Sequence, residues 1–110
     1  MEGMNCIDTH AHPNLSAFNE DREAVLKKMQ TEGVAAINVG TKESTSQLAV
    51  NLAATYEHCY AIVGLHPIQT TPGQHDEEEI GEGGKAFRSK GEVFNPDFYR
   101  QLAVEPKVVG

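Results

Sequence analysis

Three short apolar runs, separated by two helix-like segments, most constrain what this chain can fold into. The runs are residues 4–8, 34–39 and 60–65, and they are mainly apolar rather than regularly alternating with polar residues. This pattern is typical of parallel strands that are covered on both faces and joined by crossover helices. An α/β fold is therefore predicted, in which strands and helices alternate along the chain.

The two segments between the runs have the signals of amphipathic helices. Residues 19–32 begin with acidic side chains, which suit the positive end of a helix, and Gly33 ends the segment. Residues 44–56 place large apolar side chains one turn apart. The stripe of the first helix near the sheet is predicted to consist of Ala24, Val25, Lys28 and Met29.

The stretch at about 69–93 interrupts the alternation. It contains Pro72, several glycines and the acidic run 76–79, so it predicts a long exposed loop with one short helix near residues 76–80. The acidic run is interpreted as solvated surface.

A third helix is predicted after this loop. Asn95 suits its N-cap and Pro96 its first position, and the helix is expected to run through Val104 and to end at Pro106. Residues 107–110, with two adjacent valines, predict the beginning of a fourth strand.

Length and charge limit the classes of function. The chain has 110 residues, the size of one small domain, and a formal net charge of -7. A domain that reads DNA sequence needs a basic surface, so this class is disfavoured. An enzyme that meets nucleic acid only at a metal-filled pocket remains compatible, because bound cations supply positive charge locally.

The chain is expected to be cytoplasmic. No apolar stretch is long enough to span a bilayer, and the N-terminus lacks the pattern of a signal peptide, so no membrane partner is expected. Cys6 and Cys59 both lie in apolar runs and are predicted to be buried free thiols, which fits a reducing compartment.

The pair His10 and His12 follows the first apolar run. On a strand, residues two apart point to the same face, so two imidazoles would project side by side and could bind a divalent metal. Asp8 precedes them by one more step and could orient one imidazole through its second ring nitrogen. In parallel α/β folds, sites form at the carboxyl ends of the strands, where this pair is expected.

His66 directly follows the third run, between Leu65 and Pro67. The carboxyl ends of parallel strands meet at one edge of a sheet, so His66 is expected to open onto the same rim as the first pair. The remaining histidines, His58 and His75, are not expected to have a functional role.

Several motifs along the chain resemble, in their order and spacing, those of the TatD family of metal-dependent deoxyribonucleases. They cover almost the whole chain outside the loop at about 69–93. The matching stretches are Ile7–His12, Phe18–Arg22, Asn38–Thr41, Val63–Pro67 and Pro106–Gly110.

The resemblance implies a TIM-type (β/α)8 barrel that hydrolyses phosphodiesters of DNA with two divalent metals. Magnesium is the expected metal, with manganese or zinc as alternatives. By this resemblance His10 and His12 bind one metal, and His66 lies beside the metals and contacts the substrate phosphate as a catalytic residue. Two metals would polarise the phosphodiester and generate hydroxide from bound water.

The chain departs from the family pattern in its extent. Residues 1–110 correspond to about three and a half of eight βα units, and the family's remaining metal ligands would lie beyond Gly110. The chain is therefore expected to be the incomplete N-terminal segment of a single barrel domain and a poor catalyst alone. It is also expected to self-associate through exposed strand edges.

Two other functions remain open. The first is another metal-dependent barrel hydrolase, such as a cyclic amidohydrolase or a phosphoesterase of the polymerase-and-histidinol-phosphatase type, which also begins with two histidines separated by one residue. The second is a non-catalytic remnant that acts only in assembly.

Overall fold

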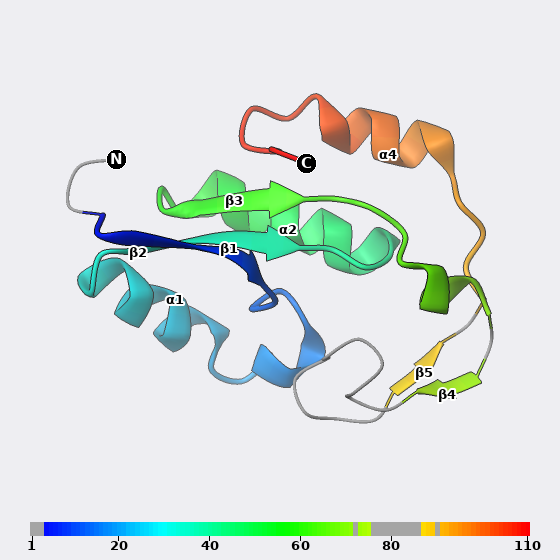
Figure 1. Cartoon of the computed structure of the whole chain (residues 1–110), viewed down its shortest axis with the longest axis horizontal. Coiled ribbons are helices and arrows are strands. Elements are labelled where there is room, and N and C mark those ends of the chain that lie inside the picture. The colour runs from blue at the N-terminus through cyan, green and yellow to red at the C-terminus, as the bar shows by residue number, and fades with distance from the viewer. Residues whose placement is uncertain (1–3, 72, 76–86, 90) are drawn as a thin grey trace.

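A parallel sheet organises the chain in the computed structural model, which describes residues 4–71, 73–75, 87–89 and 91–110. The strands β1 (Cys6–Ala11), β2 (Val34–Val39) and β3 (Cys59–Ile62) lie side by side in this order (Figure 1). Both pairings are parallel. The predicted α/β fold with parallel strands and crossover helices is confirmed, and the sheet is open at both edges of the described part.

A fourth strand begins beside β3, as predicted for residues 107–110. Ala61 and Val108 form a parallel bridge, in which the Ala61 N–H donates to the Lys107 carbonyl and the Val109 N–H to the Ala61 carbonyl. The Val63 N–H donates to the carbonyl of Gly110. The described sheet therefore extends by one strand on the side of β3, whereas β1 is its other edge.

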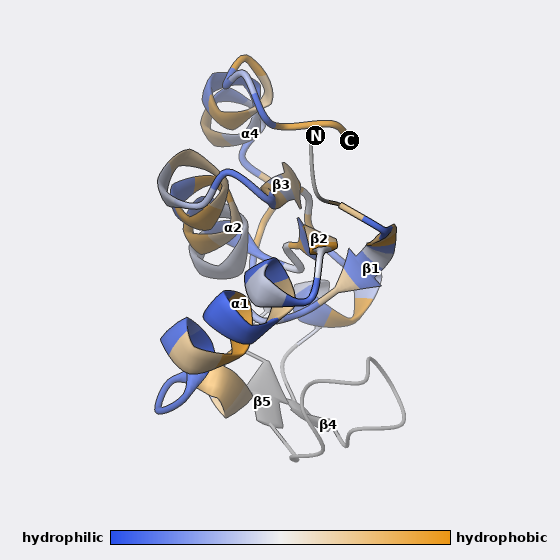
Figure 2. Ribbon diagram, turned by 90° about the vertical axis from the view of Figure 1, so that its left-hand side faces the viewer, coloured by the Kyte–Doolittle hydropathy of each residue, from blue (hydrophilic) through white to orange (hydrophobic). Residues whose placement is uncertain are grey.

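The helices α1 (Arg22–Thr31), α2 (Glu43–Thr55) and α4 (Pro96–Ala103) all lie on the same side of the sheet (Figure 2). The expectation that both faces are covered is wrong for β1, because five of its six residues are exposed. A right-handed crossover between neighbouring parallel strands returns on one side of the sheet, so successive units place their helices together.

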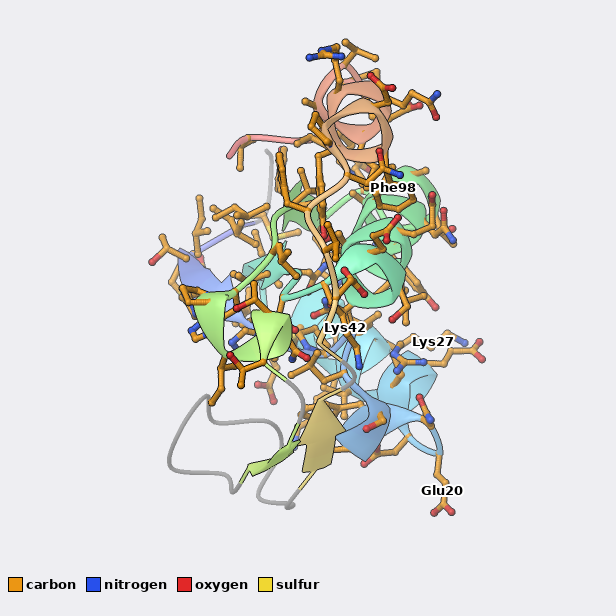
Figure 3. The ribbon with its side chains drawn as sticks, turned by 90° about the vertical axis from the view of Figure 1, so that its right-hand side faces the viewer. Glu20, Lys27, Lys42 and Phe98 are labelled. Atoms are coloured by element: carbon orange, nitrogen blue, oxygen red, sulfur yellow. The ribbon has the colours of Figure 1, made fainter. Side chains whose placement is uncertain are left out.

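Helix α1 meets the sheet through Leu26, which is fully buried against Leu52 and Cys59. The predicted stripe is confirmed at Met29, which packs against this cluster, and is wrong at Ala24 and Lys28, which are exposed. The buried Leu26 lies outside the predicted stripe. Glu20 and Lys27 reach outward from this region in Figure 3.

Gly33 ends α1 as predicted. It has a φ of 73°, in the left-handed region that glycine adopts at little cost, and its N–H donates to the carbonyl of Gln30.

Helix α2 packs on β3 and α4. Ala49, Val50 and Ala53 form one buried cluster with Ala61 of β3 and Leu102 of α4. Phe98 turns from α4 towards this cluster (Figure 3). This cluster fixes β3 and α2 against each other.

Helix α4 begins as predicted, with the Asn95 side chain accepting a hydrogen bond from the Phe98 N–H and with Pro96 in the first turn. It ends one residue earlier than expected, at Ala103, and Val104 is 79% exposed.

The stretch predicted as a long exposed loop with one short helix contains two short strands. β4 (Gly73–His75) pairs antiparallel with β5 (Phe87–Ser89), after a 3-10 turn at Pro67–Thr70. The helix predicted near residues 76–80 lies outside the described residues. The base of the stretch is closed by Glu92, whose N–H donates to the Gln69 carbonyl and whose carboxylate accepts from the Glu43 N–H at the start of α2.

The two cysteines differ in environment. Cys59 is a buried free thiol, as predicted, whereas Cys6 on β1 is exposed, so its predicted burial is wrong. Among the described residues, the helices are too short and too polar for any of them to cross a membrane.

Candidate metal centre

Three histidines from two strand ends line one cavity of about 300 Å³ at the carboxyl end of the sheet. The structure brings together His10 on β1, His12 just after it and His66 after β3. The wall between them is formed by the ends of β2 and β3 and the residues that follow. These wall residues are Val39, Gly40, Thr41, Ile62, Val63, Gly64 and Leu65.

The two histidines of β1 lie against each other. Their rings meet edge to face, with centroids 5.0 Å apart and planes at 80°. A bulge interrupts β1 between Asp8 and Ala11, because Asp8 pairs with Ala36 whereas Ala11 pairs with Asn38. Side chains from Asp8 to His12 therefore do not simply alternate between the two faces of the sheet. The bulge changes the direction in which the side chains at the end of the strand point.

The ring of His12 is oriented by a backbone carbonyl. Its Nδ1 lies 3.0 Å from the carbonyl oxygen of Val39. A carbonyl only accepts hydrogen bonds, so Nδ1 carries the proton and Nε2 keeps its lone pair in the neutral ring. This is the arrangement that a histidine needs to bind a metal through Nε2.

The surroundings of His12 also favour its neutral form. Burial lowers the pKa of the imidazole below its ordinary value. The hydrogen bond to Val39 raises the pKa, the nearby imidazoles of His10 and His66 lower it, and the carboxylate of Asp8 raises it. Burial is the largest of these effects, so the pKa of His12 lies below its ordinary value, which favours the neutral form that a metal ligand needs.

His66 has the opposite arrangement. Its Nδ1 accepts a hydrogen bond from the N–H of Ile68 at 3.1 Å, so in the neutral ring the proton is on Nε2. The backbone N–H of His66 donates to the carbonyl of Thr41 at 2.8 Å, which fixes the residue beside the end of β2. The exposed side of this imidazole is therefore a hydrogen-bond donor.

Asp8 contacts backbone rather than an imidazole. Its carboxylate accepts a hydrogen bond from the N–H of His10 at 3.1 Å, within the bulge. The predicted hydrogen bond from Asp8 to a histidine ring is not among the contacts of the described residues. Asp8 instead stabilises the backbone from which His10 projects.

A close approach of α2 to the strand ends shapes the cavity wall. The Ser46 hydroxyl accepts from the Gly64 N–H at 3.1 Å and lies 3.2 Å from the Gly64 carbonyl. A Cβ added at Gly40 would lie 2.5 Å from the Ser46 Cα, whereas one at Gly64 would meet nothing within 4 Å. Glycine at position 40 is thus required for this packing.

His58 lies apart from the cavity lining. His58 is fully buried, and its Nε2 lies 2.9 Å from the carbonyl of Leu26, so it links α1 to the start of β3. The side chain of His75 lies outside the description. A second cavity of about 290 Å³ lies between α2 and residues 105–108, but it is mainly apolar and carries no histidine.

The donor set fits one part of a divalent-metal site. His12 presents a bare Nε2, and His10 lies beside it with its ring exposed. Within the described ranges, no group of three His, Cys, Asp or Glu side chains is close enough to hold a metal ion. His10 and His12 can therefore supply two ligands, and His66 lies at the cavity wall outside such a group.

The sequence analysis missed Asn14, a buried residue that contacts the same carbonyl as His12. Its Nδ2 lies 3.1 Å from the Val39 oxygen and 3.0 Å from the Thr45 oxygen. Its acceptors are backbone carbonyls, which every residue type has, so no sequence pattern identifies them. Only its position two residues after His12 could have drawn attention to it.

Comparison with known proteins places these features in a family. The model of the family described as "TatD related DNase" matches residues 7–108. The Escherichia coli (strain K12) protein YjjV is 40% identical over 62 residues, covering 56% of this chain and 24% of YjjV. The Bacillus subtilis (strain 168) protein YabD is 36% identical over 63 residues, covering 56% of this chain and 25% of YabD.

A third relative has a similar match. A Mycoplasma pneumoniae protein is 38% identical over 65 residues, covering 58% of this chain and 25% of its own length. All three are named as uncharacterized metal-dependent hydrolases. The matched stretch therefore spans about a quarter of the length of these relatives.

Proposed function

Because the chain belongs to the TatD related DNase family, we propose that it carries the first part of a metal-dependent site that hydrolyses phosphodiester bonds of DNA. The observation that supports this most is the opposite state of two ring nitrogens. Both rings line the cavity, and in their neutral forms Nε2 has a lone pair in His12 and carries the proton in His66. A phosphodiesterase needs both, a ligand for the metal and a donor for the phosphate.

His10 and His12 are the proposed metal ligands. The hydrogen bond from Nδ1 to the Val39 carbonyl holds the ring of His12 in one tautomer and one orientation. When bound, divalent metals polarise a phosphodiester and lower the pKa of bound water. Magnesium is proposed, with manganese or zinc as alternatives, and the complete site is proposed to hold two metals.

His66 is the proposed catalytic contact to the substrate. Its Nε2–H would donate to a non-bridging phosphate oxygen, while the Ile68 N–H holds the ring through Nδ1. A hydrogen bond to a charged oxygen is stronger than one between neutral groups. The net charge of -7 favours a contact confined to this pocket over a wide basic surface for nucleic acid.

Another hydrolytic activity is favoured by one observation. The relatives are named metal-dependent hydrolases, and their names give no substrate. A metal-dependent amidohydrolase or a different phosphoesterase would use the same two histidines as ligands. A role in assembly alone would require neither a metal nor a phosphate contact.

Calorimetry on two variants separates these functions. The probes are Zn²⁺, which imidazole ligands suit, and then thymidine 5′-(p-nitrophenyl phosphate) in the presence of saturating Zn²⁺. His12→Ala should weaken zinc binding at least about 100-fold, since loss of a ligand exceeds loss of its supporting partner. His66→Phe should keep zinc binding and weaken ester binding about tenfold, because phenylalanine keeps a ring of similar shape but has no N–H to donate to the phosphate.

The opposite pattern rejects the proposal. Zinc binding that is the same in the native chain and in His12→Ala would contradict the metal role of the pair. Ester binding that is insensitive to His66→Phe, together with binding of a cyclic amide such as dihydroorotate, would favour the amidohydrolase. No binding of either probe would favour the assembly role.

A further inference from the structure

The carbonyl oxygen of Val39 accepts two side-chain hydrogen bonds at the edge of the candidate metal centre. One comes from His12 Nδ1 at 3.0 Å and the other from Asn14 Nδ2 at 3.1 Å. A carbonyl oxygen has two lone pairs, so both donors can be accepted at once. The Val39 carbonyl, which orients His12, is therefore itself held in place by the hydrogen bond from Asn14.

Asn14 connects this carbonyl to helix α2. Its amide group also donates to the carbonyl of Thr45 at 3.0 Å, so both amide hydrogens are used. Thr45 lies in the first turn of α2, where its hydroxyl accepts the N–H groups of Thr41 and Lys42 at 2.8 and 3.1 Å. One buried side chain thus joins the loop after β1, the end of β2 and the start of α2.

The two donor bonds decide how the Asn14 side chain lies. Asn14 is 2% exposed, and its Oδ1 has no hydrogen-bond partner among the described residues. Both acceptors near Nδ2 are carbonyls, so only the amide end can face them. A carboxylate has nearly the same shape but accepts only, and it would repel both oxygens.

We propose that Asn14 is a positioning residue for the metal ligand His12, acting through the Val39 carbonyl. By holding that oxygen in place, Asn14 keeps the proton of His12 on Nδ1 and the bare Nε2 towards the cavity. Partners of this kind change metal affinity about 10- to 100-fold when they are removed. The proposal rests on the metal role given to His12 above, but it concerns a ring orientation that exists without metal.

The test uses the full 110-residue chain with ¹⁵N-labelled histidine. At pH 8 without metal, imidazole nitrogen shifts report which ring nitrogen carries the proton. The native chain should show His12 protonated on Nδ1. Asn14→Asp should distribute the proton over both nitrogens and weaken zinc binding about tenfold, at the lower end of the range for such partners.

A matched control is available on α2, the helix that Asn14 contacts through the Thr45 carbonyl. Asn51 is exposed on α2, where its carbonyl oxygen accepts from Gln47, so Asn51→Asp adds the same charge away from the cavity. It should leave both the His12 tautomer and zinc affinity unchanged. This control separates the effect of the lost donors from that of an added carboxylate.

Three results would overturn the proposal. The first is an Asn14→Asp chain that keeps the Nδ1–H tautomer and native zinc affinity. The second is the same outcome for Asn14→Ala, which serves if Asn14→Asp does not fold. The third is a native chain whose His12 is protonated on Nε2, which needs no variant. None of these measurements contains a phosphodiester, so failure of the substrate proposal would be seen separately.

Discussion

Two neighbouring strands of one sheet, β1 and β2, contribute to the same cavity in different ways. β2 has no exposed residue, and Ala35, Ala36 and Asn38 are fully buried beneath the helices. β1 is exposed at five of its six positions, yet it carries His10 and leads directly into His12, the two proposed metal ligands. The exposed strand thus presents these histidines, and the buried strand supplies the carbonyl that orients His12.

The residues that stabilise the fold and the residues proposed to bind metal therefore lie on different strands. Segments with little buried apolar surface contribute little to the free energy of unfolding and open most readily. The ligands therefore lie on a strand whose packing contributes little stability, and their geometry depends on bonds to the end of β2. Substitutions at buried positions and substitutions on β1 should therefore differ in how much they change the free energy of unfolding.

The largest effect is expected from a pair of core and edge truncations. Leu26→Ala removes the buried side chain by which α1 packs against Leu52 and Cys59, and it should lower the free energy of unfolding by about 2–5 kcal/mol. Ile7→Ala acts on a β1 side chain that is 53% exposed and should lower it by less than about 1 kcal/mol. Urea denaturation followed by circular dichroism gives both values. Equal losses would show that β1 is as well packed as the covered side.

A second pair compares the ends of β2 and β3. Gly40→Ala would press a methyl group against Ser46 and should lower the free energy of unfolding by about 1–3 kcal/mol. Gly64→Ala enters open space and should change it by less than about 0.5 kcal/mol. The same denaturation experiment measures both. A harmless Gly40→Ala would mean that α2 can move away from the cavity wall.

The smallest effect concerns association through β1. We propose that its uncovered edge pairs with a second copy, since an exposed edge presents unpaired backbone groups. Ile7→Lys should weaken this association by about 1 kcal/mol, because a charge at the edge disfavours pairing. Sedimentation velocity over a range of concentrations measures the association. Val104→Lys, at the exposed position directly after α4, is the control. A native chain that is monomeric at every concentration would contradict the proposal.

Elements with local signals could be predicted from the sequence. The bounds of β2, the end of α1 at Gly33 and the start of α4 at Asn95 and Pro96 follow from residue types that act within one turn. Leu26 was missed because a helix of mixed composition offers several stripes, and the angle at which α1 meets the sheet selects one of them.

The candidate site divides in the same way. Histidines at strand ends can be recognised from spacing, so the meeting of His10, His12 and His66 at one cavity was expected. The bulge in β1 and the hydrogen bonds to the Val39 carbonyl have no residue signature, because they depend on backbone geometry brought together by folding. The short pairing of β4 with β5 was hidden by glycines and a proline that are typical of loops.

The central claim is that Nε2 is bare in His12 and carries the proton in His66, although both rings line one cavity. Histidine-selective ¹⁵N NMR of the metal-free native chain at pH 8 tests it directly, because the nitrogen shifts distinguish the two neutral tautomers. The expected result is a proton on Nδ1 of His12, facing Val39, and a proton on Nε2 of His66, opposite the Ile68 N–H. Finding both histidines in the same tautomer would contradict the division into metal ligand and phosphate donor.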